Sequence, residues 1–308
     1  MGISLSVDLA PRHPNGLRLR NPVMTASGTF GYGTEYAKVM EVERLGALVS
    51  KGTTLQPRPG NPQPRLAETP AGMLNTIGLQ NVGVHALVRD KAPIWARWEV
   101  PVIVNIAGDT IDEYARIAEV LEGTPGIAAL EINVSCPNVK AGGLAFGVNA
   151  EAAAEVVSAV RSVSSFPLIP KLSPNVTDIV AIATAVVDAG ADAVSLINTV
   201  VGMVIDIRSR RPYLSTITGG LSGPAIRPIA LRMVYQVAKH VGVPVVGIGG
   251  ITSTEDALQF LMAGASAIQV GSASFANPQA PIEIVEGLAR FLNDEGVDDI
   301  REIVGVAL

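Results

Sequence analysis

The chain has 308 residues, of which 48% are hydrophobic, 4% aromatic and 17% charged, and its formal net charge is −5. Such a weakly acidic chain lacks the basic surface that nucleic acids and anionic membranes attract, so neither kind of partner is expected. Its single cysteine excludes a disulfide framework and a multi-cysteine zinc or iron–sulfur site built from this chain alone.

The length allows either one large barrel or two ordinary domains, so other features must decide. The histidines, His13, His85 and His240, are scattered without metal-ligand spacing; we expect them to be structural and predict no metal site. The N-terminus lacks the pattern of a signal peptide, and no window is apolar for long enough to span a bilayer. We therefore expect a soluble, cytoplasmic protein.

The first 20 residues contain two weakly alternating segments, Ser4–Val7 and Leu17–Leu19, separated by prolines and a glycine. This pattern predicts a β-hairpin that precedes the main fold. Afterwards a short apolar strand, a turn and a longer helical segment follow one another repeatedly. The predicted strands are Val23–Thr25, Ala47–Lys51, Val102–Ile106, Ala129–Val134, Leu168–Leu172, Ala193–Ile197, Val245–Ile248 and Ala267–Val270.

A repeated unit supports this alternation. Ala189–Leu196 and Ala263–Val270 have nearly the same sequence pattern, and Leu45–Lys51 is a looser third copy. In each copy we expect glycine to end a helix in a left-handed cap before the chain enters a strand. Eight such units close into an α/β fold of the (β/α)8 TIM-barrel type, so residues 1–308 are predicted to form a single domain.

Three segments exceed ordinary loop length: Gln56–Leu79, Pro137–Gly147 and Gly202–Gly223. Long loops in a compact domain are usually lids or binding loops. We expect the first and third to cover the barrel mouth or to meet a partner.

The carboxyl ends of the predicted strands carry amides, hydroxyls, two lysines and a thiol, with no carboxylate and no histidine. Polar strand ends can simply face water. Lys51 and Lys171, however, lie within apolar runs, where an ammonium group needs an anionic partner. We therefore favour contact between these lysines and a ligand.

Glycine-rich turns follow the last two strands, in Gly247–Gly250 and Gln269–Ser272. Loops at these positions bind phosphate in many such barrels, because glycine lets backbone N–H groups approach the oxygens. The glycines could instead serve tight turns only. No dinucleotide fingerprint follows the first strand, which disfavours a Rossmann-type nicotinamide site. A phosphate site, a buried lysine and a ring of amides suit flavin mononucleotide (FMN).

Cys136 lies just beyond the strand that ends near Val134, where Pro137 stops the pairing. A thiol at the carboxyl end of a barrel strand could act as a base, although a lone cysteine can also be a small buried hydrophobe. Two other interpretations stay open. One is a Schiff-base aldolase that uses Lys171 as nucleophile, and the other is an apolar docking scaffold without catalysis.

The chain resembles the dihydroorotate dehydrogenases, flavoproteins of the pyrimidine pathway, from about Asn21 to Asn277. The motifs that carry this resemblance are Asn21–Gly28, Lys51–Thr54, Gly60–Arg65, Asn75–Asn81, Asn133–Asn138, Lys171–Pro174, Asn198–Thr199, Gly219–Gly223 and Gly247–Gly250. A cysteine in the fifth motif is similar to the soluble class 1 enzymes, and Gly31–Gly33, Gly60–Pro62 and Gly219–Gly223 resemble subclass 1B.

The resemblance implies oxidation of dihydroorotate to orotate, with Cys136 as the base at C5 and hydride transfer from C6 to N5 of FMN. It also implies a partner subunit that carries FAD and a [2Fe-2S] cluster and passes electrons to NAD, in a heterotetramer built on a homodimer of this chain. A fumarate-linked enzyme of class 1A type is the alternative.

The resemblance also implies which residues bind. The expected FMN contacts are Ser27, Lys51, Gly52, Asn105, Asn133, Lys171, Ile197, Gly223, Gly249, Gly250, Gly271 and Ser272. The expected substrate contacts are Lys51, Asn75, Thr76, Ile77, Gly78, Leu79, Asn133, Asn198 and Thr199.

Overall fold

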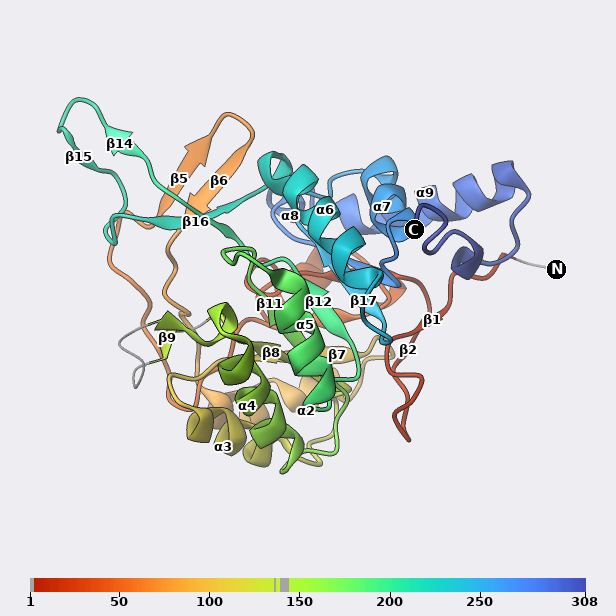
Figure 1. Ribbon diagram of the computed structural model, residues 1–308, viewed down its shortest axis with the longest axis horizontal. Helices are drawn as coiled ribbons and strands as arrows, with labels where there is room; N and C mark the ends of the chain where they lie inside the picture. The colour runs from red at the N-terminus through yellow and green to blue at the C-terminus, as the bar shows by residue number, and fades with distance from the viewer. Residues whose placement is uncertain (1–2, 136, 139–143) are drawn as a thin grey trace.

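A computed structural model describes residues 3–135, 137–138 and 144–308 (Figure 1). Its centre is an eight-stranded parallel sheet in the order β3-β18-β17-β12-β11-β8-β7-β4. The strands are β3 (Val23–Thr25), β4 (Leu48–Val49), β7 (Val102–Ile106), β8 (Ala129–Asn133), β11 (Leu168–Leu172), β12 (Val194–Leu196), β17 (Val245–Ile248) and β18 (Ala267–Val270).

The sheet closes on itself because a parallel bridge between Met24 and Ala47 joins β3 to the start of β4. The predicted barrel is therefore confirmed. Five strands have the predicted bounds, namely β3, β7, β11, β17 and β18, and the other three are shorter than predicted at one or both ends. Short apolar strands bounded by turn residues are local signals, which is why the sequence located them well.

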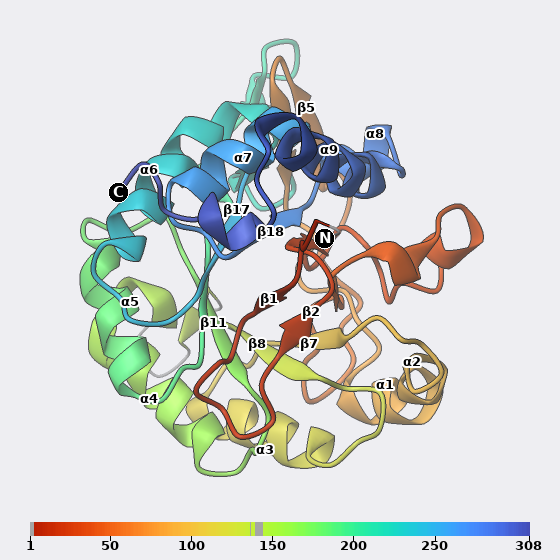
Figure 2. The ribbon, with the colours of Figure 1, turned by 90° about the vertical axis from the view of Figure 1, so that its right-hand side faces the viewer.

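Helices alternate with the strands and surround the barrel (Figure 2). They are α1 (Val84–Asp90), α2 (Ala92–Trp95), α3 (Ile111–Leu121), α4 (Ala150–Arg161), α5 (Ile179–Asp188), α6 (Arg227–Ala238), α7 (Thr254–Met262), α8 (Ala273–Ala276) and α9 (Ala280–Glu295). Single-turn 3-10 helices are η1 (Tyr36–Lys38), η2 (Val42–Arg44), η3 (Phe146–Val148), η4 (Pro224–Ile226) and η5 (Ile300–Glu302).

The helix termini follow the sequence. Side chains of Thr110, Asn149, Asp178 and Ser253 accept hydrogen bonds from first-turn amides of α3, α4, α5 and α7, and each such cap stabilises its helix by about 1 kcal/mol.

The repeated unit is only partly uniform. Gly190 and Gly264 have φ of +104° and +102° after α5 and α7, as predicted. Gly46 in the third copy does not have a positive φ, so the left-handed cap predicted there is wrong. A Cβ at Gly46 would lie 2.0 Å from the carbonyl oxygen of Asn21, so close backbone approach is what requires glycine at this position.

The predicted N-terminal hairpin is present. Strand β1 (Val7–Asp8) pairs antiparallel with β2 (Arg18–Leu19), and Leu9, Leu17 and Leu19 are buried. The hairpin lies across one end of the barrel, and the opposite end carries a projecting sheet (Figures 1 and 2). The hairpin thus covers the end of the barrel opposite the projecting sheet.

The first and third long segments are more ordered than loops. The first contains β5 (Leu66–Thr69) and β6 (Gly72–Asn75), and the third contains β16 (Gly219–Ser222) and begins at the end of β13 (Val200–Gly202). These strands form an antiparallel sheet in the order β13-β16-β6-β5. A hairpin of β14 (Ile205–Asp206) and β15 (Arg211–Pro212) extends from it. We call this sheet with its hairpin the arm. In the second long segment, β9 (Pro137–Asn138) pairs with β10 (Leu144–Ala145).

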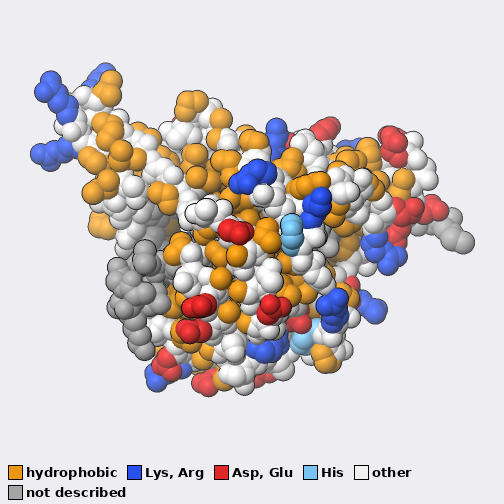
Figure 3. All heavy atoms as spheres, in the orientation of Figure 1, with side chains coloured by type: hydrophobic (Ala, Val, Ile, Leu, Met, Phe, Trp, Pro, Cys, Tyr) orange, Lys and Arg blue, Asp and Glu red, His pale blue; other side chains and the backbone are white. Residues whose placement is uncertain are grey.

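The arm exposes apolar and basic side chains together. Ile207 is 84% exposed and Met203 and Ile205 are about half exposed, while Arg208 and Arg210 are exposed in the turn between β14 and β15. Figure 3 shows hydrophobic and basic side chains together on this projection. Within the described residues, no helix is both long and apolar enough to cross a bilayer. The predicted cytoplasmic location stays a prediction.

Candidate active site

The alternation of side chains along β8 places Glu131 and Asn133 on the same side of that strand. Glu131 hydrogen-bonds to residues of β7, β12 and β18, which it can reach only through the barrel interior. Asn133 therefore also points inward, one step closer to the carboxyl end of the barrel. This end of the barrel gathers most of the residues that the sequence predicted.

Glu131 is the most central of the residues that sequence reasoning missed. Its carboxylate is fully buried and accepts hydrogen bonds from Asn105 Nδ2 at 2.7 Å, Gln269 Nε2 at 2.7 Å and Ser195 Oγ at 2.9 Å. Sequence reasoning found no carboxylate at the strand ends, and Glu131 places one directly beneath them. The available signal was a single charge inside an apolar strand.

Lys171 on β11 faces this carboxylate. Its side chain is almost fully buried, and Nζ lies 3.9 Å from Glu131 Oε2 and donates to Ser27 Oγ at 3.3 Å. The expectation that a buried lysine here needs an anion is met by the protein itself. Lys171 and Ser27, both predicted FMN contacts, are brought together as one unit.

Lys51 follows β4 and has a different environment. It is partly buried, and burial, followed by repulsion from Arg65, holds the pKa of its ammonium group below the ordinary value, while Glu35 acts in the opposite direction. No described carboxylate forms an ion pair with Lys51. Of the two predicted lysines, Lys51 is therefore the one that an anionic ligand would best stabilise.

The glycine turns form a cradle. A Cβ at Gly250 would lie 2.7 Å from the carbonyl oxygen of Gly223, and one at Gly249 would lie 3.5 Å from Ile197 Cγ1. In the described part of the chain, the backbone amides of Gly249, Gly250, Gly271 and Ser272 donate no hydrogen bond to a protein acceptor. The cradle thus offers the free N–H groups that a phosphate requires.

Two buried acceptors in the same interior lack partners among the described residues, Asn105 Oδ1 and Gln269 Oε1. A Cβ at Gly52 would lie 3.0 Å from Asn105 Oδ1 and 3.2 Å from Leu79 Cδ2, so the unpaired oxygen faces the junction of two predicted binding segments. Buried polar atoms without partners are uncommon. Free amides, unpaired acceptors and lysines together fit a flavin nucleotide.

The predicted substrate asparagines also converge. Asn198 Nδ2 donates to Asn133 Oδ1 at 3.3 Å and to Ser135 Oγ at 3.0 Å, and Asn198 Oδ1 accepts from the amide of Thr199 at 2.8 Å. Asn75 on β6 donates to the carbonyl oxygen of Gly220 at 3.3 Å. A Cβ at Gly220 would lie 2.0 Å from Thr199 Oγ1, so the arm lies directly beside the Asn198–Thr199 segment.

The segment from Thr76 to Leu79 is held by Asn61, which lies in the stretch before β5. Asn61 Nδ2 donates to Thr76 Oγ1 at 3.0 Å, the amide of Asn61 donates to the carbonyl oxygen of Ile77 at 3.0 Å, and Gly78 and Leu79 both have positive φ. The Thr76 side chain is thus engaged within the protein, while Leu79 approaches Gly52.

Cys136, the predicted base, lies outside the described residues. Its neighbour Ser135 accepts from Asn198, and Tyr114 donates to the backbone oxygen of Asn133 at 2.6 Å. Tyr114 was not predicted as part of the site. It anchors the end of β8 from which the cysteine segment begins.

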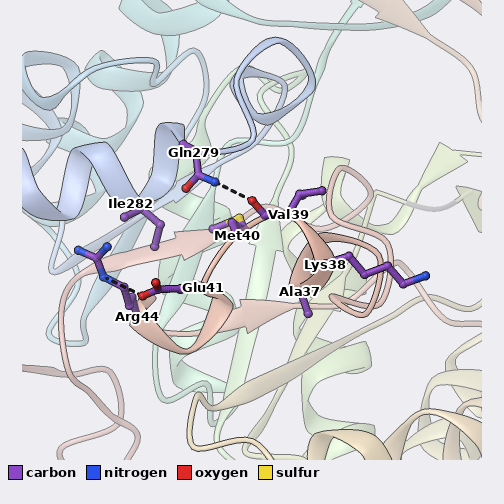
Figure 4. Close-up of a pocket in the computed structure, with 8 residues that line it drawn as sticks. All are labelled: Ala37, Lys38, Val39, Met40, Glu41, Arg44, Gln279 and Ile282. Atoms are coloured by element: carbon purple, nitrogen blue, oxygen red, sulfur yellow. Dashed lines mark hydrogen bonds and ion pairs between the residues drawn. The ribbon is translucent and has the colours of Figure 1, made fainter.

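A separate pocket of about 360 Å³ lies between the η1–η2 segment and the start of α9 (Figure 4). Gln279 donates to the backbone oxygen of Val39 at 2.7 Å across it, and Glu41 and Arg44 form an ion pair at its rim. None of the predicted site residues lines this pocket. The described residues also contain no cluster of His, Cys, Asp and Glu that could hold a metal ion.

Comparisons with known proteins show which family this chain resembles over nearly its whole length. A family model described as "Dihydroorotate dehydrogenase" matches residues 12–292. A protein of Pelobacter propionicus is 59% identical over 290 residues, which cover 94% of this chain and 95% of that protein. A protein of Geotalea uraniireducens is 55% identical over 304 residues, which cover 99% and 98%. A protein of Desulforudis audaxviator is 58% identical over 292 residues, 95% of each. All three are named "Dihydroorotate dehydrogenase B (NAD(+)), catalytic subunit".

Proposed function

The chain belongs to the dihydroorotate dehydrogenase family, and from this membership we propose that it oxidises dihydroorotate to orotate in pyrimidine biosynthesis, as the catalytic subunit of a type B enzyme. The observation that carries the proposal is identity of 55–59% over nearly the whole chain with relatives of that name. The convergence of the predicted binding residues at one end of the barrel supports it.

We propose FMN as the resident cofactor. The residues that would hold it are the predicted set around the glycine cradle, Ser27, Lys51, Gly52, Asn105, Asn133, Lys171 and Ile197. The free amides of the cradle suit a phosphate. Lys51, whose ammonium group is partly buried, would be stabilised by the negative charge of a bound ligand. When bound, FMN supplies the acceptor for the hydride that leaves C6 of dihydroorotate.

The substrate would be held by Asn75, Asn133, Asn198 and Thr199, with the Thr76–Leu79 segment closing one side. Asparagine offers both a donor and an acceptor, which matches a cyclic imide without adding charge. The partly buried Lys51 would pair with the substrate carboxylate. These residues orient the substrate and exclude water from it.

We propose Cys136 as the base that removes the proton at C5. The segment that bears it starts from a strand end that Tyr114 holds through the Asn133 carbonyl group. A base must be held within hydrogen-bond reach of the proton it takes, and the anchored end of β8 would serve this positioning.

A partner subunit is implied by the relatives' name, which calls each a catalytic subunit. We propose that the partner carries FAD and a [2Fe-2S] cluster, that NAD is the final acceptor, and that two copies of this chain form the core of a heterotetramer. The single cysteine of the chain could not ligate such a cluster, so another chain would have to supply it. Exposed apolar side chains on the arm are of the kind that partners cover.

The rival functions have less support. A Schiff-base aldolase would need Lys171 as a free amine, but this lysine faces Glu131 and donates to Ser27. A fumarate-linked enzyme is disfavoured because the relatives' printed name gives NAD(+).

The deciding experiment is the visible spectrum of the purified chain before and after dihydroorotate is added without air. We expect a flavin spectrum that bleaches on addition of the substrate, and released FMN in the heat-denatured supernatant. A colourless protein, or a flavin that dihydroorotate does not bleach, would contradict the proposal.

A further inference from the structure

Glu131, to which the proposed function assigns no role, is the centre of a buried network. Four side chains point at its carboxylate: Asn105 from β7, Lys171 from β11, Ser195 from β12 and Gln269 from β18. With β8 itself, five of the eight barrel strands are linked through one carboxylate. An anion that is fully buried is costly unless it is compensated in this way.

The charge of Glu131 determines which way the neighbouring amides face. Its two oxygens can only accept, so Asn105 and Gln269 both turn their NH2 groups toward it. The consequence is that Asn105 Oδ1 and Gln269 Oε1 face away from Glu131 and lack partners among the described residues. The unpaired acceptors of the site are thus a direct result of the buried carboxylate.

The same carboxylate holds Lys171. Oε2 is shared by Asn105 Nδ2 at 2.7 Å and Lys171 Nζ at 3.9 Å, so the lysine and the asparagine are arranged around one oxygen atom. Lys171 also donates to Ser27 Oγ, which fixes the other side of the ammonium group. Asn105, Lys171 and Ser27 are all proposed FMN contacts.

We propose that Glu131 is a positioning residue for the flavin site: it presents Asn105 as an acceptor, holds the Lys171 ammonium group, and sets the electrostatic potential felt by the cofactor. The inference rests on the proposed function, because it takes FMN as the ligand. Glu131 itself lies beneath these side chains and is not proposed to touch FMN.

The first test is Glu131→Gln, which preserves shape but removes the charge. Glutamine has one acceptor and one donor, so Asn105 or Gln269 must turn its oxygen toward position 131 and its NH2 group toward the site. We expect the dissociation constant of FMN to rise at least about tenfold, in line with one lost buried hydrogen bond. We also expect a higher reduction potential of the bound flavin, because a negative charge near the reduced, electron-rich ring is gone.

The second test is Ser195→Ala, which keeps the charge and removes one donor from Oε1. The carboxylate is then less neutralised, so the flavin potential should fall, opposite in direction to Glu131→Gln. Because Ser195→Ala is a smaller change, it still tests the proposal if Glu131→Gln does not fold.

The outcomes are separable by first measuring the wild-type chain. A wild-type chain that binds no FMN would overturn both the proposed function and this inference. A wild-type chain that binds FMN and is bleached by dihydroorotate, combined with an unchanged or lowered potential in Glu131→Gln, would overturn this inference alone. If Glu131→Gln is insoluble, an unchanged flavin reduction potential in Ser195→Ala would overturn this inference.

Discussion

Asn198 donates from Nδ2 to Asn133 Oδ1 at 3.3 Å, which joins the ends of β12 and β8 past the intervening β11 although the two residues are 65 positions apart. Asn133 Oδ1 also accepts from the amide of Ser135 at 3.1 Å. Because this oxygen is used twice within the protein, Asn133 can offer a ligand only its NH2 group. Asn133 is therefore a donor in the proposed substrate site.

Asn133→Asp tests this donor role. Aspartate keeps an oxygen for Asn198 and Ser135 but replaces the NH2 group with negative charge, which opposes an anionic substrate. In the flavin-loaded fraction, we expect the dissociation constant of orotate, measured from the change in flavin absorbance, to rise at least about tenfold. Ser135→Ala is the matched control, because it removes only one acceptor of Asn198 and should weaken binding much less. Equal losses in the two variants would contradict the assignment.

Cys136→Ala tests the proposed base. Loss of a general base should slow flavin reduction by dihydroorotate at least about 100-fold, while FMN content stays near that of the wild-type chain. Rapid mixing without air measures the step directly. Cys136→Ser keeps a group that can accept a proton, so its rate of flavin reduction should lie between those of the wild-type chain and Cys136→Ala. Reduction of Cys136→Ala at the wild-type rate would show that another group takes the proton.

Gly250→Ala tests the cradle. Gly250 has φ of +73°, and an added Cβ would lie 2.7 Å from the carbonyl oxygen of Gly223. We expect loss of most bound FMN together with a lower melting temperature, since a left-handed alanine alone costs about 1–2 kcal/mol.

Gly123→Ala separates backbone strain from loss of the cradle. Gly123 has φ of +67°, but an added Cβ would meet nothing within 4 Å, and the residue lies after α3, away from the glycine turns. This variant should lose stability and retain FMN. If Gly250→Ala retained FMN to the same extent as Gly123→Ala, the cradle would not be the phosphate site.

The barrel could be predicted from the sequence because its signals are local. Each strand is a short apolar run, and turns with glycine or asparagine mark its end, so five strands have the predicted bounds. The residues at those ends, such as Lys171 and Asn198, were recognised for the same reason. Barrel closure then places them side by side without further information.

The arm and the Glu131 network could not be predicted in this way. The pairing of Asn75 with Gly220 joins glycine-rich segments far apart in the chain, where no local alternation indicates strands. Glu131 looks like an isolated charge in a strand, and only the closed barrel reveals that Gln269 and Ser195 face it. The spacing of Glu131 and Asn133 by two residues was the one available hint that both share the inner face.

Lys51 gives a prediction of pH dependence, because burial and Arg65 lower the pKa of its ammonium group below the usual 10.5. The folded chain releases this proton at a lower pH than the unfolded chain does. The stability of the ligand-free protein, relative to Lys51→Met, should therefore rise as the pH passes from the folded to the unfolded pKa.

Orotate affinity should fall over the same alkaline range, because the anion loses its cationic partner. Denaturant titrations and flavin absorbance titrations between pH 7 and about 10.4 measure both trends. Lys51→Arg stays charged throughout this range, so its orotate affinity should remain nearly constant. An equal alkaline decline in Lys51→Arg would assign the pH dependence to a different group.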